Sequence, residues 1–427
     1  MLNKVLDKNL FYEEFKKLKS KVKKDKNLLY KAEVNSAITL GWVIHNQDLV
    51  IDELMKSIKQ GLYDTPTAVE KEVLIKNKKR LLYGFDWHEK VLQAVVSRVL
   101  SDYFETVYSE SLSSYRKGRG SFLVLSKVSS FLSKINNKDN IFIIKKDIKS
   151  YGDNIDHELL FEMLSAFIKD KTLMELIKKI IRFNYVEFGT KAIKVKDKGM
   201  PTGSPINNIM VNLFLSDLDK KIESLSADDL CYFRYGDDIF IASQNKSLIQ
   251  KAEAVLNRYI SQKNLEFNDE KSVEWVINDI FRSKKFKYLG LMVGLDGVIT
   301  PTPEKDEQIK QEIKDLLKKV LVMNRTLKLS KKEKVLSLIR ATRESLFRTD
   351  LFCDLSSYFL VINDERYWKE LDLWIAKTIL RLVYKTGSDK NFGKFSYQDL
   401  RKTGLPSIVH SRRLYLRDGL KFKTYAY

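Results

Sequence analysis

Two groups of acidic residues are the side chains in this sequence best suited to chemistry. Asp147 directly follows the run Asn-Ile-Phe-Ile-Ile-Lys-Lys (140–146), and Asp237 and Asp238 stand side by side after Arg-Tyr-Gly. A carboxylate at the end of a buried strand, or a pair of adjacent carboxylates, is unfavourable unless a cation or hydrogen bonds neutralise it. Asp147 and Asp237 on adjacent strands would hold two Mg²⁺ ions, since carboxylate oxygens are ligands that Mg²⁺ prefers. The chemistry of such a pair is in-line phosphoryl transfer: one ion activates the attacking hydroxyl and the other neutralises the leaving pyrophosphate.

A third feature decides between this interpretation and a simpler one. Taken alone, the Tyr-Gly-Asp-Asp stretch is equally well explained as a hairpin with an ordinary acidic turn. Between the two acidic groups, however, lies the turn Gly-Met-Pro-Thr-Gly-Ser-Pro (199–205), whose glycines would let the backbone approach a ligand closely. The three features in this order favour a catalytic site.

The elements that must position these residues follow from the spacing of apolar side chains. We expect strands over 140–145, 273–277 and 286–293 and a hairpin over 232–242. Helices are expected over 10–22, 87–108, 156–169, 172–183 and 247–262, with another beginning at 206. Residues 298–303 are the best linker, and beyond them the chain is predicted to be helical, with capping boxes Ser330–Glu333 and Ser396–Asp399. The middle of the chain is therefore α+β and the last third is α.

Composition limits the class of protein. The 427 residues carry a formal net charge of +20, which indicates a polyanionic partner, although lysines that merely keep the protein soluble would give the same total. Residues 1–31, 305–340 and 401–427 each hold six more basic than acidic side chains. Two cysteines and four histidines argue against a disulfide framework or a zinc module and predict a cytoplasmic protein. No apolar run reaches the roughly 18 residues of a membrane span, and no secretory signal is expected.

The motifs around the acids resemble those of bacterial reverse transcriptases. Residues 147–157 (Asp-Ile-Lys-Ser-Tyr-Gly-Asp-Asn-Ile-Asp-His) are similar to the family's first aspartate block, 199–206 to its nucleotide-site turn and 235–238 to its catalytic hairpin. Residues 265–271 and 286–290 are similar to its later palm blocks and primer grip, and 78–84 and 115–120 to its fingers segments. The resemblance implies an α+β right-hand polymerase fold, with fingers, a palm made of an antiparallel sheet plus helices, and an all-helical thumb. It divides the chain into an N-terminal helical extension (1–74), fingers and palm (75–300) and a helical thumb with the C-terminal region (301–427).

The resemblance also implies roles for individual residues. Asp147, Asp237, Asp238 and the backbone carbonyl of Ile148 would bind two Mg²⁺ ions, and Lys271 would protonate the leaving pyrophosphate as a general acid. The nucleotide would contact Lys79, Arg80, Tyr151, Gly152, Thr202 and Gly203. The nucleic acid would contact Arg116, Lys117, Arg119, Tyr288, Leu289 and Gly290. The partners implied are dNTPs, an RNA template and a DNA product.

Two positions depart from the family pattern. Where the family usually has a bulky aromatic residue that excludes the 2′-hydroxyl of a ribonucleotide, this chain has Gly152, with Tyr151 one residue earlier. Where the family has glutamine in the nucleotide turn, this chain has Thr202. Glycine has no side chain to exclude a hydroxyl, so we predict weakened sugar selection or a gate displaced to Tyr151.

Two other functions stay open beside RNA-directed DNA synthesis. One is RNA-dependent RNA polymerisation or template-independent nucleotide polymerisation, because Tyr-Gly-Asp-Asp is also a viral polymerase motif and Asp153 could read the 2′-hydroxyl. The other is a catalytically silent scaffold that binds nucleic acid. Among reverse transcriptases, the short chain with its N-terminal extension most resembles the stand-alone, retron-like and abortive-infection-related enzymes. That resemblance implies antiphage defence with a partner non-coding RNA.

Overall fold

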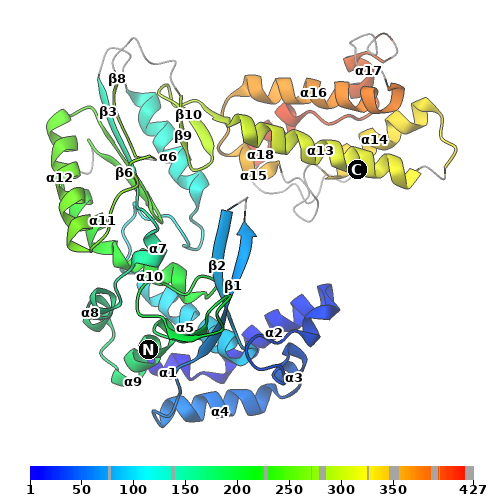
Figure 1. Ribbon diagram of the computed structural model, residues 1–427. Helices are drawn as coiled ribbons and strands as arrows, with labels where there is room; N and C mark the ends of the chain where they lie inside the picture. Colours follow the sequence, from blue (N-terminus) through cyan, green and yellow to red (C-terminus); the bar gives the residue numbers. More distant parts are fainter. Residues whose placement is uncertain are drawn as a thin grey trace. The chain divides into compact units, whose positions relative to one another are not determined.

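The computed structural model describes residues 1–427 except 76–77, 136–139, 226–228, 271, 278–284, 325–326, 346–354, 386–392, 394 and 419–427. The chain forms two compact units (Figure 1). Unit 1 comprises residues 1–120 and 141–276, and unit 2 comprises residues 121–140 and 277–427. The boundaries predicted from the sequence, 74/75 and 300/301, fall at the end of strand β1 and inside strand β11.

A four-stranded sheet in unit 1 carries the acidic residues. Its strand order is β6 (Cys231–Tyr235), β7 (Asp238–Ser243), β3 (Ile141–Asp147) and β8 (Val273–Ile277). Strand β7 pairs antiparallel with both β6 and β3. These strands confirm the predictions over 140–145, 232–242 and 273–277.

The two faces of this sheet have different roles because side chains alternate along a strand. Ile144, Ile239 and Ile241 share one face and belong to the same core as buried residues of helix α12 (Lys246–Gln262), which lies along the sheet in Figure 1. Asp147 and Asp238 are in register with each other on the opposite face. The packing of α12 therefore fixes which way the acids point.

A second sheet in unit 1 has the order β2 (Lys78–Phe85), β1 (Thr67–Ile75), β4 (Asn184–Val186) and β5 (Ile193–Val195). Strands β1 and β2 form an antiparallel hairpin, and β4 pairs parallel to β1. Tyr83, Phe85 and Phe183 pack edge to face beneath it, with ring centroids 4.9 to 5.0 Å apart. This aromatic cluster joins the hairpin to the chain that leads into the 199–205 turn.

Helix α5 (Trp87–Phe104) lies in the core of unit 1, where its Val91, Leu92, Val95 and Val99 are buried as the sequence predicts. Besides α5 and α12, the described helices of unit 1 are α1 (Leu2–Val5), α2 (Lys8–Lys24), the 3₁₀ helix Lys26–Tyr30, α3 (Leu40–His45), α4 (Gln47–Lys59), α7 (Tyr151–Asn154), α8 (His157–Phe167), α9 (Lys171–Ile181), α10 (Ile206–Phe214) and α11 (Ser216–Glu223). The lysine-rich helix expected over 10–22 is α2, which Asp7 caps by accepting from the backbone N–H of Asn9.

Unit 2 consists of a small sheet and a set of helices. The sheet has the order β11 (Ile299–Pro301), β10 (Leu291–Gly294) and β9 (Lys285–Tyr288). Helix α6 (Ser121–Lys134) packs on it, and Ser129 Oγ donates to the Gly297 carbonyl at 2.5 Å. The remaining helices are α13 (Pro303–Met323), α14 (Lys331–Ser345), α15 (Ser356–Phe359), α16 (Glu365–Tyr384), α17 (Tyr397–Lys402) and α18 (Ile408–Asp418). Both predicted capping boxes are present.

Two predictions in this region were wrong. Residues 286–293 form a hairpin of two strands, because Leu289 (φ 45°) and Gly290 (φ 83°) make a two-residue turn with both φ values positive. Residues 298–303 are not a free linker: β11 pairs with β10, and Thr302 then caps α13 with Pro303 in its first turn. Each described helix is too short or too polar to serve as a bilayer-spanning segment.

Candidate active site

Asp147, Asp237 and Asp238 come together at one end of the β6-β7-β3-β8 sheet. A carboxylate oxygen can be chosen from each so that all three lie within 4.8 Å of one another. Asp147 is buried, and the other two are half-buried. Asp147 and Asp238 are directly opposed across β3 and β7, and Asp237 lies in the turn that leads into β7.

Gly236 allows the turn that presents the second pair of acids. Tyr235 and Asp238 are the last paired residues of β6 and β7, so Gly236 and Asp237 form a two-residue loop. Gly236 has φ 67°, a left-handed conformation that costs glycine little and other residues more. The sequence therefore predicts this local geometry correctly.

The chemistry of the donors fits a divalent cation. Three carboxylates share the site, and Lys145 Nζ lies 3.9 Å from Asp238 Oδ1. Like charges gathered in a partly buried place disfavour ionisation of all three groups, and a bound cation would offset this cost. An all-oxygen donor set suits Mg²⁺ or Mn²⁺ better than softer metals.

Backbone hydrogen bonds tie the end of β3 to the surrounding chain. The N–H of Ile148 donates to the Asp237 carbonyl at 3.3 Å, and the N–H of Asn268 donates to the Asp147 carbonyl at 2.7 Å. The Ile148 side chain is buried, so only its backbone can face a ligand. Lys271, the predicted general acid, lies outside the described residues.

The glycine turn lies against the first acidic block. Gly199 (φ 77°) lies so close to the backbone of Asp153 that an added Cβ would be 2.5 Å from the Asp153 carbonyl oxygen. The N–H of Met200 donates to the Gly152 carbonyl at 2.7 Å. On the other side, the N–H of Tyr83 donates to the Thr202 carbonyl at 3.1 Å. The structure thus brings the predicted nucleotide residues Gly152, Thr202 and Gly203 into one region.

Tyr151 points away from this region, so a gate displaced to Tyr151 is not what the structure shows. Its ring is buried in the core, and its hydroxyl donates to the Val211 carbonyl at 2.7 Å. Burial raises the pKa of Tyr151 well above its ordinary value. Gly152, by contrast, faces open space, because an added Cβ would have no described atom within 4 Å.

The predicted triphosphate contacts, Lys79 and Arg80, are exposed on strand β2. Lys79 forms an ion pair with Glu72 on β1 at 3.0 Å. Consecutive residues of a strand point to opposite faces of the sheet, so only one of the two can face a nucleotide on a given side.

Arg116 has an internal role that the sequence analysis did not predict. Its guanidinium is buried and donates to Glu105 and to the carbonyls of Ser109 and Leu112. It therefore holds the loop before α6 together and cannot also grip a phosphate in this conformation. Arg119 pairs with Glu110 at 2.6 Å, and Lys117 is exposed.

The same loop delivers Tyr115 to the acids. Ser114 Oγ accepts a hydrogen bond from the N–H of Gly236 at 2.9 Å, so the next residue lies beside the catalytic turn. Tyr115 has φ 55°, a conformation rare for a non-glycine residue, and its side chain is 58% exposed. Partial burial raises the pKa of Tyr115, and the carboxylate of Asp237 adds to the effect. Its place in the motif 115–120 was the only sequence signal for this position.

Like Tyr115, Lys196 lies near the site and was not among the predicted site residues. Its Nζ lies 3.3 Å from the Tyr83 hydroxyl, which in turn donates to Glu70 Oε1 at 3.2 Å. Burial lowers the pKa of Lys196, although nearby Asp153 opposes the shift. No local motif marks this lysine, because its partners are more than a hundred residues away in the chain.

The predicted primer-contacting residues lie in unit 2, in the β9–β10 hairpin. The Tyr288 side chain is fully buried, so a contact at this turn would use the backbone and the side chain of Leu289.

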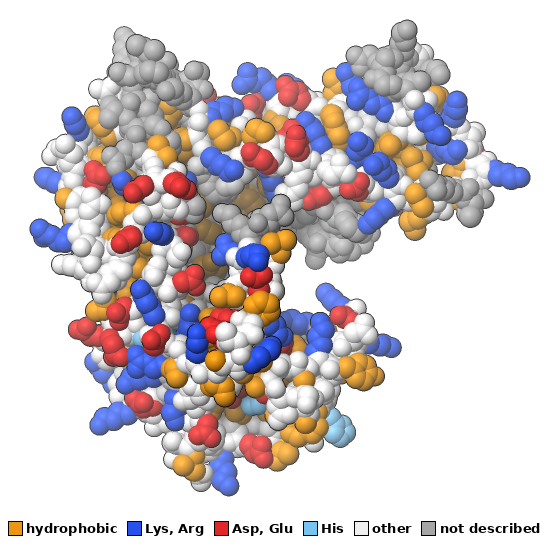
Figure 2. All heavy atoms as spheres, viewed as in Figure 1, with side chains coloured by type: hydrophobic (Ala, Val, Ile, Leu, Met, Phe, Trp, Pro, Cys, Tyr) orange, Lys and Arg blue, Asp and Glu red, His pale blue; other side chains and the backbone are white. Residues whose placement is uncertain are grey.

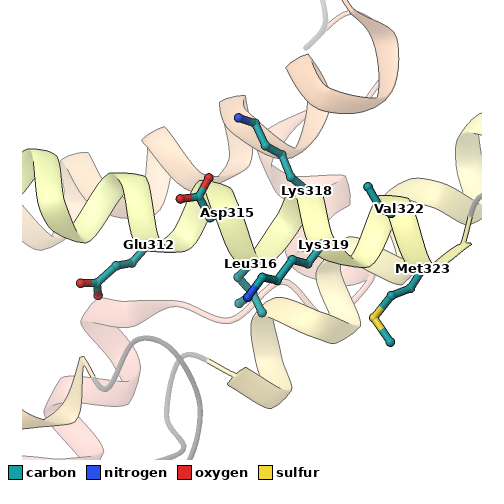
Figure 3. A pocket seen from close by; sticks show the side chains of 7 residues that line it. All are labelled: Glu312, Asp315, Leu316, Lys318, Lys319, Val322 and Met323. Atoms are coloured by element: carbon teal, nitrogen blue, oxygen red, sulfur yellow. The ribbon is translucent and has the colours of Figure 1, made fainter.

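A hollow of about 660 Å³ along α13, also in unit 2, does not resemble an active site. Figure 3 shows Asp315 and Lys318 projecting to one side of the helix and Leu316 and Met323 to the other. Figure 2 shows Lys and Arg side chains spread over the helical part of unit 2 on the face in view.

Comparison with known proteins gives a match to the part of the chain that contains the three acids. Residues 69–293, more than half of the 427, match the family described as "Reverse transcriptase (RNA-dependent DNA polymerase)". The matched range contains the three acids, the glycine turn and the β1–β2 hairpin.

Among curated proteins, the chain is similar to an uncharacterised 91 kDa protein in the cob intron of Schizosaccharomyces pombe, with 29% identity over 42% of this chain and 21% of that protein. It is also similar to the group II intron-encoded protein LtrA of Lactococcus lactis, with 25% identity over 41% of this chain and 28% of LtrA. The matched part thus spans less than a third of either relative's length.

Among solved structures, the chain is similar to telomerase from Candida tropicalis in complex with a TWJ fragment of telomeric RNA. The TM-score is 0.49 with 15% identity, covering 88% of this chain and 66% of that one. The corresponding Candida albicans structure gives a TM-score of 0.48 with 12% identity, covering 87% and 71%.

Proposed function

The chain belongs to the reverse transcriptase (RNA-dependent DNA polymerase) family, and from this premise we propose that it synthesises DNA on an RNA template by two-metal nucleotidyl transfer. The observation that carries the proposal is the group Asp147, Asp237 and Asp238, whose carboxylate oxygens lie within 4.8 Å of one another at a sheet end. Oxygen ligands gathered in this way are what two Mg²⁺ ions require for in-line displacement at phosphorus.

Each part of the site has a proposed role in this reaction. The three acids, with the Ile148 carbonyl, would hold the metal ions, which when bound supply activation of the primer hydroxyl and neutralisation of the pyrophosphate. The backbone around Gly152, Thr202 and Gly203 would seat the nucleotide, since it forms the open surface next to the first acidic block. Lys79 or Arg80 would contact the triphosphate, and Lys271 would donate a proton to the leaving group.

Beyond the nucleotide site, we propose that Lys117, Arg119, Leu289 and Gly290 contact the nucleic acid. Lys117 and Leu289 are assigned because the first is exposed and the second forms a hairpin turn with Gly290. Arg119 would have to leave Glu110, with which it now forms an ion pair.

Incorporation of labelled dNTPs on a primed RNA template tests the proposal directly. The wild-type chain should extend the primer in Mg²⁺, and the double variant Asp237→Asn/Asp238→Asn should lose all measurable activity. Asp102→Asn is a matched control, because Asp102 is an exposed acid on α5. Full activity in the double variant would refute the role of these acids, whereas a wild-type chain that binds RNA but extends no primer would favour a nucleic-acid-binding scaffold.

A second candidate is synthesis of RNA, which the open space at Gly152 favours because a Cβ there would have no described atom within 4 Å. The same assay is run with NTPs in place of dNTPs, and with intact template or with template that RNase has digested. These comparisons separate DNA synthesis, RNA synthesis and template-independent synthesis. Extension with NTPs alone would replace the first proposal by RNA polymerisation, and extension without template would replace it by template-independent synthesis.

We also propose that the template is a partner non-coding RNA and that the product acts in antiphage defence. The support is the resemblance of the architecture, with its N-terminal helical extension, to stand-alone bacterial reverse transcriptases, whereas the name of LtrA as a group II intron-encoded protein favours an intron RNA instead. Sequencing of RNA bound to the purified protein distinguishes the two templates. Phage plating on cells carrying the wild-type or the Asp237→Asn/Asp238→Asn chain tests the defence role, and equal plating on both would contradict it.

A further inference from the structure

A buried polar network lies directly beneath the turn that carries Asp237 and Asp238. Its centre is the ion pair between Arg234 and Asp219, in which Nε and Nη2 of the arginine donate to the two carboxylate oxygens at 2.8 and 2.6 Å. Tyr232 also donates to Asp219, at 2.7 Å. Both charged side chains are fully buried. Burial works to lower the pKa of Arg234, but Asp219 outweighs it and keeps the pKa above its ordinary value.

This network holds Gly236 from both sides. The N–H of Gly236 donates to Ser114 Oγ at 2.9 Å, and its carbonyl accepts from Arg234 Nη1 at 3.3 Å. Glycine is the residue in the loop with the greatest conformational freedom. One hydrogen bond on each of the two peptide units that flank the Gly236 Cα therefore restricts the part of the turn that would otherwise move most.

Ser114 is itself held in a single orientation. Its hydroxyl donates to Asn212 Oδ1 at 2.8 Å, and Asn212 Nδ2 donates back to the Ser114 carbonyl at 2.7 Å. A hydroxyl has one proton, so donation to Asn212 leaves its lone pairs to accept from Gly236. Asn212 is also bonded through its carbonyl to Arg234 Nη2 at 2.9 Å. The network is thus closed, and each member fixes the next.

We propose that Ser114 is a positioning residue for the metal site: by fixing the Gly236 peptide, it sets the directions of the Asp237 and Asp238 carboxylates. The inference rests on the proposed function, since it assigns a supporting residue to the same metal centre. Carboxylates held in place bind a cation without first losing conformational freedom, so a looser turn lowers the affinity for metal.

Ser113 provides a matched control for Ser114. It is the adjacent residue, it is also buried, and its Oγ has no hydrogen-bond partner among the described residues. Alanine at either position removes the same atom from the same buried segment. Only alanine at position 114 removes an acceptor from the catalytic turn.

Direct binding of Mn²⁺ to the full chain, followed by electron paramagnetic resonance, tests the proposal without any need for turnover. We expect Ser114→Ala to weaken Mn²⁺ binding about tenfold, the effect of losing one hydrogen bond to a buried group, and Ser113→Ala to leave it within twofold of wild type. Asp237→Asn/Asp238→Asn identifies the signal that belongs to this site. Equal Mn²⁺ affinity in the two serine variants would overturn the proposal.

Ser114→Cys keeps the test decisive where Ser114→Ala does not fold. Cysteine is nearly the same size as serine, so the free energy of unfolding should stay close to that of the wild type. Sulfur is a weak acceptor, so Mn²⁺ binding should again weaken. Wild-type Mn²⁺ affinity in a folded Ser114→Cys protein would also overturn the proposal.

Primer extension then separates this inference from the proposed function. In Ser114→Ala the Mg²⁺ concentration for half-maximal rate should rise about tenfold, and saturating Mg²⁺ should restore most of kcat. A wild-type chain that binds Mn²⁺ but extends no primer would refute the polymerase proposal alone, because the serine comparison would still stand. A loss of kcat that saturating Mg²⁺ does not restore would overturn the positioning role.

Discussion

Asp147 and Asp238 stand directly opposite each other in the antiparallel pair of β3 and β7, on the sheet face turned away from α12. Directly opposed like charges destabilise a sheet. The strand pairing is nevertheless held by the apolar residues on the α12 face, such as Ile144 and Ile241. The core thus supports an arrangement of charges that would not persist on an isolated hairpin.

Removal of one of these charges should separate stability from metal binding. In EDTA, Asp147→Asn should unfold at the same or a slightly higher temperature than wild type, because one of three clustered negative charges is gone. Mg²⁺ at about a hundred times its dissociation constant should stabilise the wild type by about 2.7 kcal/mol and the variant far less. Thermal unfolding with and without Mg²⁺ measures both effects. An undiminished response to Mg²⁺ in Asp147→Asn would show that the ion binds elsewhere.

Sugar selection should depend on position 152 and not on Tyr151. The wild type should discriminate weakly between dNTPs and NTPs, and Gly152→Phe should discriminate more strongly, because the space at this backbone position is open. Tyr151→Phe should leave the ratio unchanged and cost about 1 kcal/mol of stability through loss of its hydrogen bond to Val211. Competitive incorporation assays measure the ratio. Strong wild-type discrimination that Tyr151→Phe abolishes would contradict this prediction.

Stability should fall on acidification because of His157. The ring is buried with Nε2 2.8 Å from the Gly199 carbonyl, and burial lowers the pKa of His157 although that hydrogen bond opposes the shift. Below about pH 6.5 the unfolded chain therefore binds a proton that the folded chain does not, so stability is lost as pH falls through the folded pKa. Unfolding followed between about pH 8 and pH 5 should show this loss, and His157→Gln should show less of it. Identical pH profiles for the two proteins would exclude His157 as the cause.

Binding to RNA should weaken steeply with salt. The net charge of +20 and the basic segment 305–340, which covers most of α13 and α14, predict several phosphate contacts. Each contact contributes a slope of about −0.7 to the dependence of log K on log salt concentration for a single strand. Filter binding at low and physiological ionic strength measures the slope. Lys318→Gln/Lys319→Gln, a change of two exposed lysines on α13, should make the slope shallower, and an unchanged slope would contradict a role of these lysines in RNA binding.

The gathering of Asp147, Asp237 and Asp238 was predictable because its determinants are local. The run before Asp147 has the composition of a buried strand, and Gly236 marks a two-residue turn, so the strand ends and the acids follow from short stretches. Spatial proximity of the two groups then needed only that β3 and β7 be neighbours.

The sequence did not reveal features that depend on distant partners. Tyr151 is buried because its hydroxyl reaches Val211, sixty residues further along the chain, and Ser114 meets Asn212 across 98 residues. Arg116 was predicted to contact the nucleic acid, and only the folded loop shows that its guanidinium donates to Glu105 and two carbonyls. Leu289 in a left-handed turn runs against the preference of its residue type, so Gly290 alone was too weak a local signal to predict the split of 286–293 into two strands.

Helix α6 is synthesised long before the strand on which it packs. It is made before the whole β6-β7-β3-β8 sheet, yet it packs on β10, which follows its last residue, Lys134, by more than 150 positions. Four apolar side chains of α6 are buried: Val124, Leu125, Val128 and Leu132. During translation they stay uncovered until β10 is made, although the residues of unit 1 that precede and follow α6 in the chain are synthesised earlier. A nascent or prematurely terminated chain that ends before residue 285 would carry this apolar stripe uncovered, which makes it a natural target for chaperones and proteases.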